Sequence, residues 1–244
     1  MKKKFQNIYK RLIYFIFKAF HGKIKGIIKL NNKTDIKEVF FSDTHKYSIY
    51  FCQNSRLYTD TIHDTAIIKD NYLIDGPSFQ FRENKMEEAK HNNSFYKGTP
   101  RIQKKLKGKV FSLLTGGGGN NNYYHWLFDV LPRLVILREK IKLRDIDYFL
   151  FPRIDLPFQK QSLDLLNIPL TKRLSSQTFR HVYADEIIAV DHPCVILNDP
   201  LKDNENIPDW IINFYKDELK IKANFEKKYD QIFIDRDDST SNIK

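Results

Sequence analysis

The stretch that decides the fold is Lys109–Leu134, KVFSLLTGGGGNNNYYHWLFDVLPRL. Its first seven residues predict a β-strand, because they carry β-branched, aromatic and aliphatic side chains. Four glycines and three asparagines follow, and the apolar residues after them recur at helical spacing, which predicts a helix over Tyr123–Lys140. A strand that turns through glycines into a helix is typical of a parallel sheet covered by helices.

The same alternation continues along the rest of the chain. After the first pair, the sequence predicts in turn a strand, a helix, a strand, a helix and a strand over residues 147–151, 157–167, 186–190, 208–219 and 231–235. We therefore expect an α/β fold for residues 108–244.

The preceding part of the chain has a different pattern. Residues 46–52 and 65–74 are rich in β-branched and aromatic side chains and predict short strands, with a turn at residues 69–71. A polar connection follows from residue 82 to residue 108. We expect three regions: a basic arm over 1–30, a small β-rich region with a polar linker over 31–107, and the α/β region over 108–244.

Composition excludes several classes of protein. The 244 residues are 41% hydrophobic and 14% aromatic, which is enough to bury a core and excludes low-complexity disorder. No apolar run reaches about eighteen residues, so a membrane-spanning helix is not expected. Cys52 and Cys194 form neither a disulfide framework nor a metal-ligand pattern, which favours a reducing compartment and a cytoplasmic location.

Positive charge is concentrated in the N-terminal arm. Nine of the 41 Lys and Arg residues lie before residue 31, and the first acidic residue is Asp35, so the arm carries +9 of the net +11. The remaining 214 residues hold 32 basic and 30 acidic side chains. This near balance argues against a nucleic-acid-binding domain.

The arm has the pattern of an amphipathic helix. Apolar residues fall on one face and Lys3, Lys10, Arg11 and Lys18 on the other; the apolar face holds Phe5, Ile8, Tyr9, Leu12, Ile13, Ile16 and Phe20. Such a helix can lie in a bilayer interface, so we expect peripheral contact of residues 1–30 with the inner face of the cell membrane. A terminal helix that packs its apolar face on its own domain is the alternative.

The glycine-rich turn allows close approach of a ligand or of another backbone segment. Gly116–Gly119 can adopt positive φ, and Asn120, Asn121 or Asn122 can cap the following helix. The spacing matches neither a dinucleotide-binding fingerprint nor a P-loop, so a plain strand-to-helix turn is equally consistent.

Three titratable side chains share a face of the helix that follows. His125, Asp129 and Arg133 are spaced by four residues, and Pro132 should bend the helix beside them. A carboxylate paired with His or Arg in apolar surroundings can be tuned for general-base catalysis. A structural His and an Asp129–Arg133 ion pair are the alternative.

The run Asn122–Leu134, NYYHWLFDVLPRL, closely resembles the signature of glycosyltransferase family 61, a group that includes capsular polysaccharide biosynthesis proteins. Residues 156–169, LPFQKQSLDLLNIP, resemble a later helix of that family, and residues 229–239, YDQIFIDRDDS, resemble its strand ending in Ser-Arg. Asp235 stands where the family usually has Ser, whereas Arg236 matches. The resemblance covers roughly residues 108–244.

The resemblance implies a Rossmann-like N-terminal half of a GT-B-type enzyme, inverting and independent of metals and cofactors. Its partners would be a nucleotide-sugar donor, a UDP-sugar above all, and a glycan or lipid-linked acceptor. His125 and Asp129 would be catalytic, either one being the base. The expected substrate-binding residues are Gly117, Gly118, Asn122, Tyr124, Trp126, Arg133 and Arg236.

Two further expectations follow from the last residues of the sequence. Family members continue into an R-R-x-x-N-E-like stretch and a second, donor-binding half, so we expect either a longer protein or a short member that needs a partner. The run Asp235–Asp238 also resembles the metal-binding Asp-x-Asp motif of GT-A transferases. A non-catalytic, membrane-associated scaffold in polysaccharide assembly is the alternative outside enzymes.

Overall fold

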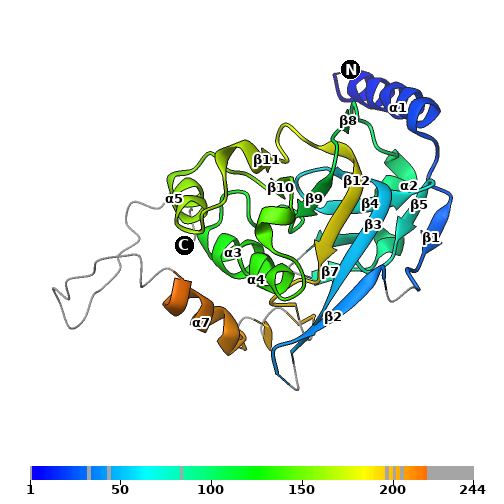
Figure 1. The fold of residues 1–244 in the computed structure, drawn as a ribbon. Helices are drawn as coiled ribbons and strands as arrows, with labels where there is room; N and C mark the ends of the chain where they lie inside the picture. The colour runs from blue at the N-terminus through cyan, green and yellow to red at the C-terminus, as the bar shows by residue number, and fades with distance from the viewer. Residues whose placement is uncertain are drawn as a thin grey trace.

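The computed structural model describes residues 2–31, 34–42, 45–82, 85–195, 198–199, 202–203 and 206–218. It is a mixed α/β protein with one extensive β-sheet (Figure 1). The first half contains α1 (Lys2–His21), β1 (Gly26–Ile28), β2 (Ile36–Phe40), β3 (Lys46–Thr59), β4 (Asp64–Lys69), β5 (Tyr72–Ile74), β6 (Phe79–Arg82), β7 (Lys85–Glu87), η1 (Ala89–His91), α2 (Ser94–Lys97) and β8 (Lys104–Lys105).

The second half alternates strands and helices. It contains β9 (Lys109–Ser112), α3 (Tyr123–His125), the π-helical turn η2 (Trp126–Val130), α4 (Pro132–Arg138), η3 (Leu143–Asp145), β10 (Tyr148–Phe151), α5 (Pro157–Leu165), η4 (Leu170–Lys172), β11 (Arg173–Ser175), β12 (His181–Val190) and α7 (Asp209–Glu218). The predicted alternation is confirmed for these elements as far as α7, while the strand expected over 231–235 lies outside the described residues.

Four neighbouring strands of the second half pair in parallel, in the spatial order β12-β9-β10-β11. The chain passes from β9 to β10 and then to β11 in one direction, and afterwards returns to place β12 on the other side of β9. β11 was not expected from the sequence, because only three residues pair with β10 and they carry no strand pattern.

The long antiparallel pairing of β3 with β12 joins the two halves of the chain. It runs from Tyr58 opposite His181 to Ile49 opposite Val190. β3 extends seven residues beyond the expected strand over 46–52, since its later residues pair with both β4 and β12. Strands from both sides of residue 107 therefore belong to one sheet.

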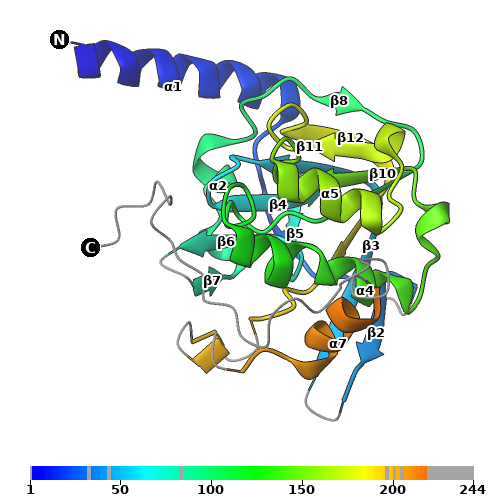
Figure 2. The same ribbon diagram turned by 90° about the vertical axis from the view of Figure 1, so that its left-hand side faces the viewer.

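The described residues form three apolar clusters, and the two larger ones cover the two faces of the parallel strands. Helices α4, α5 and α7 cover one face, where Trp126, Leu134 and Phe214 pack with Phe111 and Phe149 (Figure 2). The second core includes Ile67 of β4 and Ile74 of β5 packed with Val110, Leu150 and Ile187. Helices thus cover one face of the parallel strands, and the other face packs with residues of β4 and β5, which belong to the same sheet.

Helix α1 leaves much of its apolar face exposed. Figure 2 shows its N-terminal part extending beyond the rest of the chain. Its exposed large apolar side chains are Ile8, Tyr9, Leu12, Phe15, Ile16 and Phe20. The alternative in which this face packs on its own domain is therefore wrong for these residues. No helix within the described residues is long and apolar enough to cross a membrane.

Candidate functional site

The candidate site lies where the strand order of the parallel sheet reverses. The glycine-rich turn follows the carboxyl end of β9, and Asp191 and His192 follow the carboxyl end of the adjacent β12. Ligands of open α/β sheets bind outside the carboxyl ends of strands at such a reversal. The fold therefore brings together two segments that are more than seventy residues apart in the sequence.

The helix expected over 123–140 is divided into three pieces at Pro132. In the π-helical turn the amide of Leu131 donates to the carbonyl of Trp126, 3.1 Å away. Because Pro132 has no N–H, the carbonyl of Phe128 lacks its helical donor, and it accepts from the thiol of Cys194 instead, at 3.2 Å. The predicted interruption of the helix is confirmed, since α4 begins anew at Pro132, and the contact with Cys194 ties this point to the segment after β12.

His125 and Asp129 form a short, partly buried pair. The Nδ1 atom of His125 lies 2.6 Å from Oδ2 of Asp129, and their side chains are 27% and 6% exposed. The hydrogen bond to Asp129 raises the pKa of His125 above its ordinary value, although burial opposes this. The carboxylate is thus enclosed, whereas the imidazole reaches solvent.

His192 is a second imidazole beside the same carboxylate. Its Nε2 atom lies 3.8 Å from Oδ2 of Asp129 and has no hydrogen-bond partner among the described residues. Its Nδ1 accepts from the amide of Cys194 at 3.4 Å, which assigns the proton to Nε2. Its ring stacks on Phe81, and burial lowers the pKa of His192 to about 4.

His192 is not among the site residues predicted from the sequence. His192 comes just after β12, the strand that lies beside β9 where the strand order reverses. The sequence alone does not give the strand order, so this position identifies His192 only once the structure is known. A cavity of about 290 Å³ adjoins this segment, lined among others by Asp191, His192, Tyr47 and Lys46.

The buried guanidinium of Arg133 contacts main-chain carbonyls beside the site and does not pair with the carboxylate of Asp129. Its Nε donates to the main-chain carbonyl of Asp129 at 2.9 Å, and its Nη1 donates to the carbonyl of Val190 at 3.2 Å. The side chain is fully buried, which lowers its pKa to about 10, and Nη2 has no partner in the described part of the chain. The ion pair considered from the sequence is therefore wrong, and Arg133 is not positioned to contact a substrate at the surface.

The glycine-rich turn requires glycine for two reasons. Gly116 and Gly117 have φ of +67° and +105°, the left-handed region in which side chains are unfavourable. A Cβ on Gly117 would lie 2.4 Å from the carbonyl oxygen of Ile62, and one on Gly118 would lie 3.1 Å from Cγ of His125. The predicted close backbone approach is confirmed, and its partner is the loop at residues 60–63.

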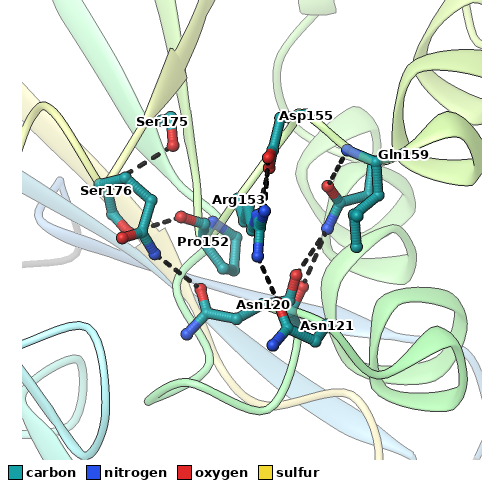
Figure 3. Close-up of polar contacts among 11 residues, drawn as sticks. Asn120, Asn121, Pro152, Arg153, Asp155, Gln159, Ser175 and Ser176 are labelled. Carbon is teal, nitrogen blue, oxygen red and sulfur yellow. Dashed lines mark hydrogen bonds and ion pairs between the residues drawn. The ribbon is translucent and has the colours of Figure 1, made fainter. Parts of the chain in front are cut away.

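Polar side chains from the neighbouring strand ends hold this turn in place (Figure 3). The amide of Gln159, at the start of α5, donates to the carbonyls of Gly119 and Asn120 at 3.3 and 3.0 Å. Arg153, just after β10, donates to Asn121 at 2.8 Å and also pairs with Asp155. The turn beside His125 is therefore braced by the ends of the adjacent elements.

The remaining predicted site residues fall in different environments. Asn122 caps α3, its side chain accepting from the amides of Tyr124 and His125 at 2.9 and 3.4 Å. Tyr124 is half-buried against Phe128. Trp126 is fully buried and donates to Ser162, so the structure does not present it to a substrate.

Some of the residues predicted for the site lie outside the described part of the chain. Arg236 and the Asp235–Asp238 run lie outside the described residues. Within the residues that the structure describes, no group of three or more His, Cys, Asp or Glu side chains is arranged to hold a metal ion.

No match to this chain was found among protein families, curated proteins or solved structures.

Proposed function

We propose that this protein is a glycosyltransferase that uses His125, oriented by Asp129, to activate an acceptor hydroxyl. The observation that carries the proposal is the 2.6 Å His125–Asp129 pair beside a braced glycine turn at the reversal of the strand order. The resemblance of residues 122–134 to glycosyltransferase family 61 supports the reaction class. The parallel strands β9–β12 are consistent with one Rossmann-like half of a GT-B enzyme.

Relative exposure distinguishes the roles of the two residues. His125 reaches solvent and Asp129 is enclosed, so His125 is the group that meets the acceptor. As the acceptor oxygen bonds to the anomeric carbon, its proton passes to the imidazole and the bond from that carbon to the diphosphate breaks. The nucleoside diphosphate leaves with the bonding electrons, and Asp129 stabilises the imidazolium.

The substrates follow from the resemblance. The donor is a nucleotide-sugar, a UDP-sugar in the first instance, and the acceptor is a glycan or a lipid-linked glycan of a surface polysaccharide. Arg236 remains the predicted ligand of the donor diphosphate, because a guanidinium suits two phosphate oxygens. The exposed apolar face of α1 supports peripheral contact with a membrane on which a lipid-linked acceptor would lie.

The test is release of nucleoside diphosphate from a panel of nucleotide-sugars with simple glycosides and a bacterial lipid extract as acceptors. We expect turnover with at least one donor when the donor-binding half or partner implied by the resemblance is supplied, and a loss of about 10²–10⁴-fold in His125→Gln under the same conditions. His91→Gln is the matched control, since His91 lies on the surface in η1. Equal turnover by His125→Gln and His91→Gln would contradict the role of His125.

A further inference from the structure

A second cavity lies between α1 and the body of the protein. Its volume is about 600 Å³, which is within the range of ligand sites. Residues of α1 form one wall, and β3, the loop after it and the segment after α2 form the other. The helix is held over this cavity at its C-terminal end, where Lys18 donates to the carbonyl of Tyr96 and His21 contacts the carbonyl of Arg101.

The lining of this cavity carries an excess of positive charge. Lys10, Lys97, Arg101 and Arg180 line it, and none of them takes part in an ion pair within the described residues. The lining contains one carboxylate, that of Asp60. Its Oδ1 accepts from the amides of residues 62, 63 and 64 at 2.9, 2.7 and 2.9 Å, so it is engaged by its own loop.

Neither arginine forms an ion pair within the described residues, and the carboxylate of Asp60 only partly offsets the burial that lowers the pKa of Arg180. Main-chain carbonyls hold Arg180, since its Nη2 donates to Asp60 and its Nε to Thr59. The pKa of Arg180 is lowered by burial and also by the positive charge of Arg101. A bound anion would offset the repulsion between Arg101 and Arg180. One guanidinium group can donate two parallel hydrogen bonds to two oxygens of the same phosphate.

The residues around the cavity indicate that an anion bound there would belong to a membrane lipid. Tyr9 lines the cavity and is also one of the exposed apolar residues of α1. The unpartnered apolar face of α1 therefore begins at the cavity wall, and such a face is suited to a bilayer interface. The phosphate group of a membrane lipid would contact the arginines, while the acyl chains of that lipid remain beside α1.

We infer that the cavity lined by Lys10, Lys97, Arg101 and Arg180 binds a phosphomonoester or diphosphate group carried on a membrane lipid. The cavity is linked to the candidate active site through the loop at residues 60–63. That loop lines the cavity with Asp60 and Ile62, and the carbonyl of Thr61 accepts from Asn120 of the glycine-rich turn at 2.7 Å. The inference rests on the membrane contact included in the proposed function, and it is independent of sugar transfer.

The test compares vesicle binding of the full chain and two double variants. Vesicles of phosphatidylcholine contain either phosphatidic acid, which exposes a phosphomonoester, or phosphatidylserine at matched surface charge. Lys97→Gln/Arg101→Gln removes two cations of the cavity, and neither side chain makes a hydrogen bond that the described structure records. Arg82→Gln/Lys107→Gln is the matched control, because it removes the same charge from exposed positions outside both α1 and the lining.

We expect the wild type and the Arg82→Gln/Lys107→Gln control to prefer phosphatidic acid by roughly tenfold, and the Lys97→Gln/Arg101→Gln variant to lose this preference. Equal preference in both variants, or none in the wild type, would overturn the inference. Titration with inorganic pyrophosphate separates the sources of phosphate. Pyrophosphate binding without any vesicle preference would overturn the lipid source and indicate a soluble phosphate compound. Absence of binding to all vesicles would instead contradict the membrane contact of α1.

Discussion

At the scale of residues, the site consists of the enclosed carboxylate of Asp129 and two imidazoles, His125 and His192, whose pKa values are shifted in opposite directions. The pKa of His125 is raised by its bond to Asp129, while burial lowers the pKa of His192 to about 4. Groups whose environments push their pKa values apart are typical of acid–base sites. In the proposed mechanism His125 is therefore the group that exchanges protons with a substrate, whereas His192 is neutral beside the carboxylate at pH 7.

Replacing the carboxylate should lower the pKa of His125. In Asp129→Asn the hydrogen bond that raises this pKa is lost, so His125 releases its proton at lower pH and the acidic limb of the pH–rate profile moves to lower pH. Turnover falls, because the imidazolium formed in the reaction loses its counter-charge. NMR titration of the His125 ring measures the shift directly, and an unchanged pKa would contradict the pairing.

Replacing the second imidazole should change the pKa of His125 in the opposite direction. In His192→Phe, stacking on Phe81 is retained but the N–H directed at Asp129 is removed. The carboxylate then holds the proton of His125 more tightly, so the pKa of His125 rises. The same NMR titration detects this, and a fall in the pKa would show that His192 does not act on Asp129.

At the scale of elements, the turn from β9 to α3 positions His125. Asn122 begins α3 by accepting from two amides, the second being that of His125 itself. Gln159 and Arg153 brace the turn from the neighbouring elements. The orientation of the imidazole thus depends on a cap and on contacts with two other parts of the sheet.

Loss of the cap should destabilise the protein measurably. We expect Asn122→Ala to lower the free energy of unfolding by about 1 kcal/mol in urea denaturation. Asn121→Ala is the control, because its side chain accepts from exposed Arg153 at the surface, and about 0.5 kcal/mol or less is expected. Equal losses in the two variants would argue against the capping role.

The exposed face of α1 predicts membrane binding that depends on its apolar side chains. Replacing Leu12, Phe15 and Phe20 with Gln should weaken flotation with anionic liposomes by roughly tenfold or more, since each side chain loses its burial in the interface. Gln at the equally exposed Phe40, Ile102 and Leu170 is the control and should leave flotation unchanged. Unchanged flotation of the α1 variant would exclude this contact.

Local patterns in the sequence predicted many of these elements and part of the site. The spacing of apolar residues indicated β9, β10, α5, β12, α7 and the helical segment with its bend at Pro132. Spacing of four residues brought His125 and Asp129 together. The pairing of β3 with β12, the short β11 and the approach of His192 depend on contacts between distant segments. Their residues carry no local signal for these contacts, so sequence reasoning missed them.

At the scale of the whole molecule, one sheet includes strands from both sides of residue 107, and buried histidines couple its stability to pH. His192 lies at the end of β12, and His181 lies at its start with a pKa lowered to about 3 by burial. Both are neutral in the folded protein at pH 7. Unfolding exposes them to water, where their pKa returns to about 6.5.

The free energy of unfolding should therefore fall on acidification. Below the unfolded pKa of 6.5 the unfolded chain binds protons that the folded chain does not, until pH falls through the folded values of about 4 and about 3. Each histidine contributes a slope of about 1.4 kcal/mol per pH unit inside this window. The raised pKa of His125 acts above pH 6.5 and does not offset the loss. Urea denaturation at pH 6 and pH 5 measures it, and equal stability would contradict the burial of both rings.

In the proposed mechanism His125, held by Asp129, accepts the proton of the acceptor hydroxyl. Rescue of His125→Gly by imidazole in solution tests this step, because only the missing ring is supplied. We expect nucleoside diphosphate release to fall in His125→Gly and to recover with imidazole concentration, whereas Asp129→Asn should not recover. Full turnover of His125→Gly without imidazole would show that His125 is not the base.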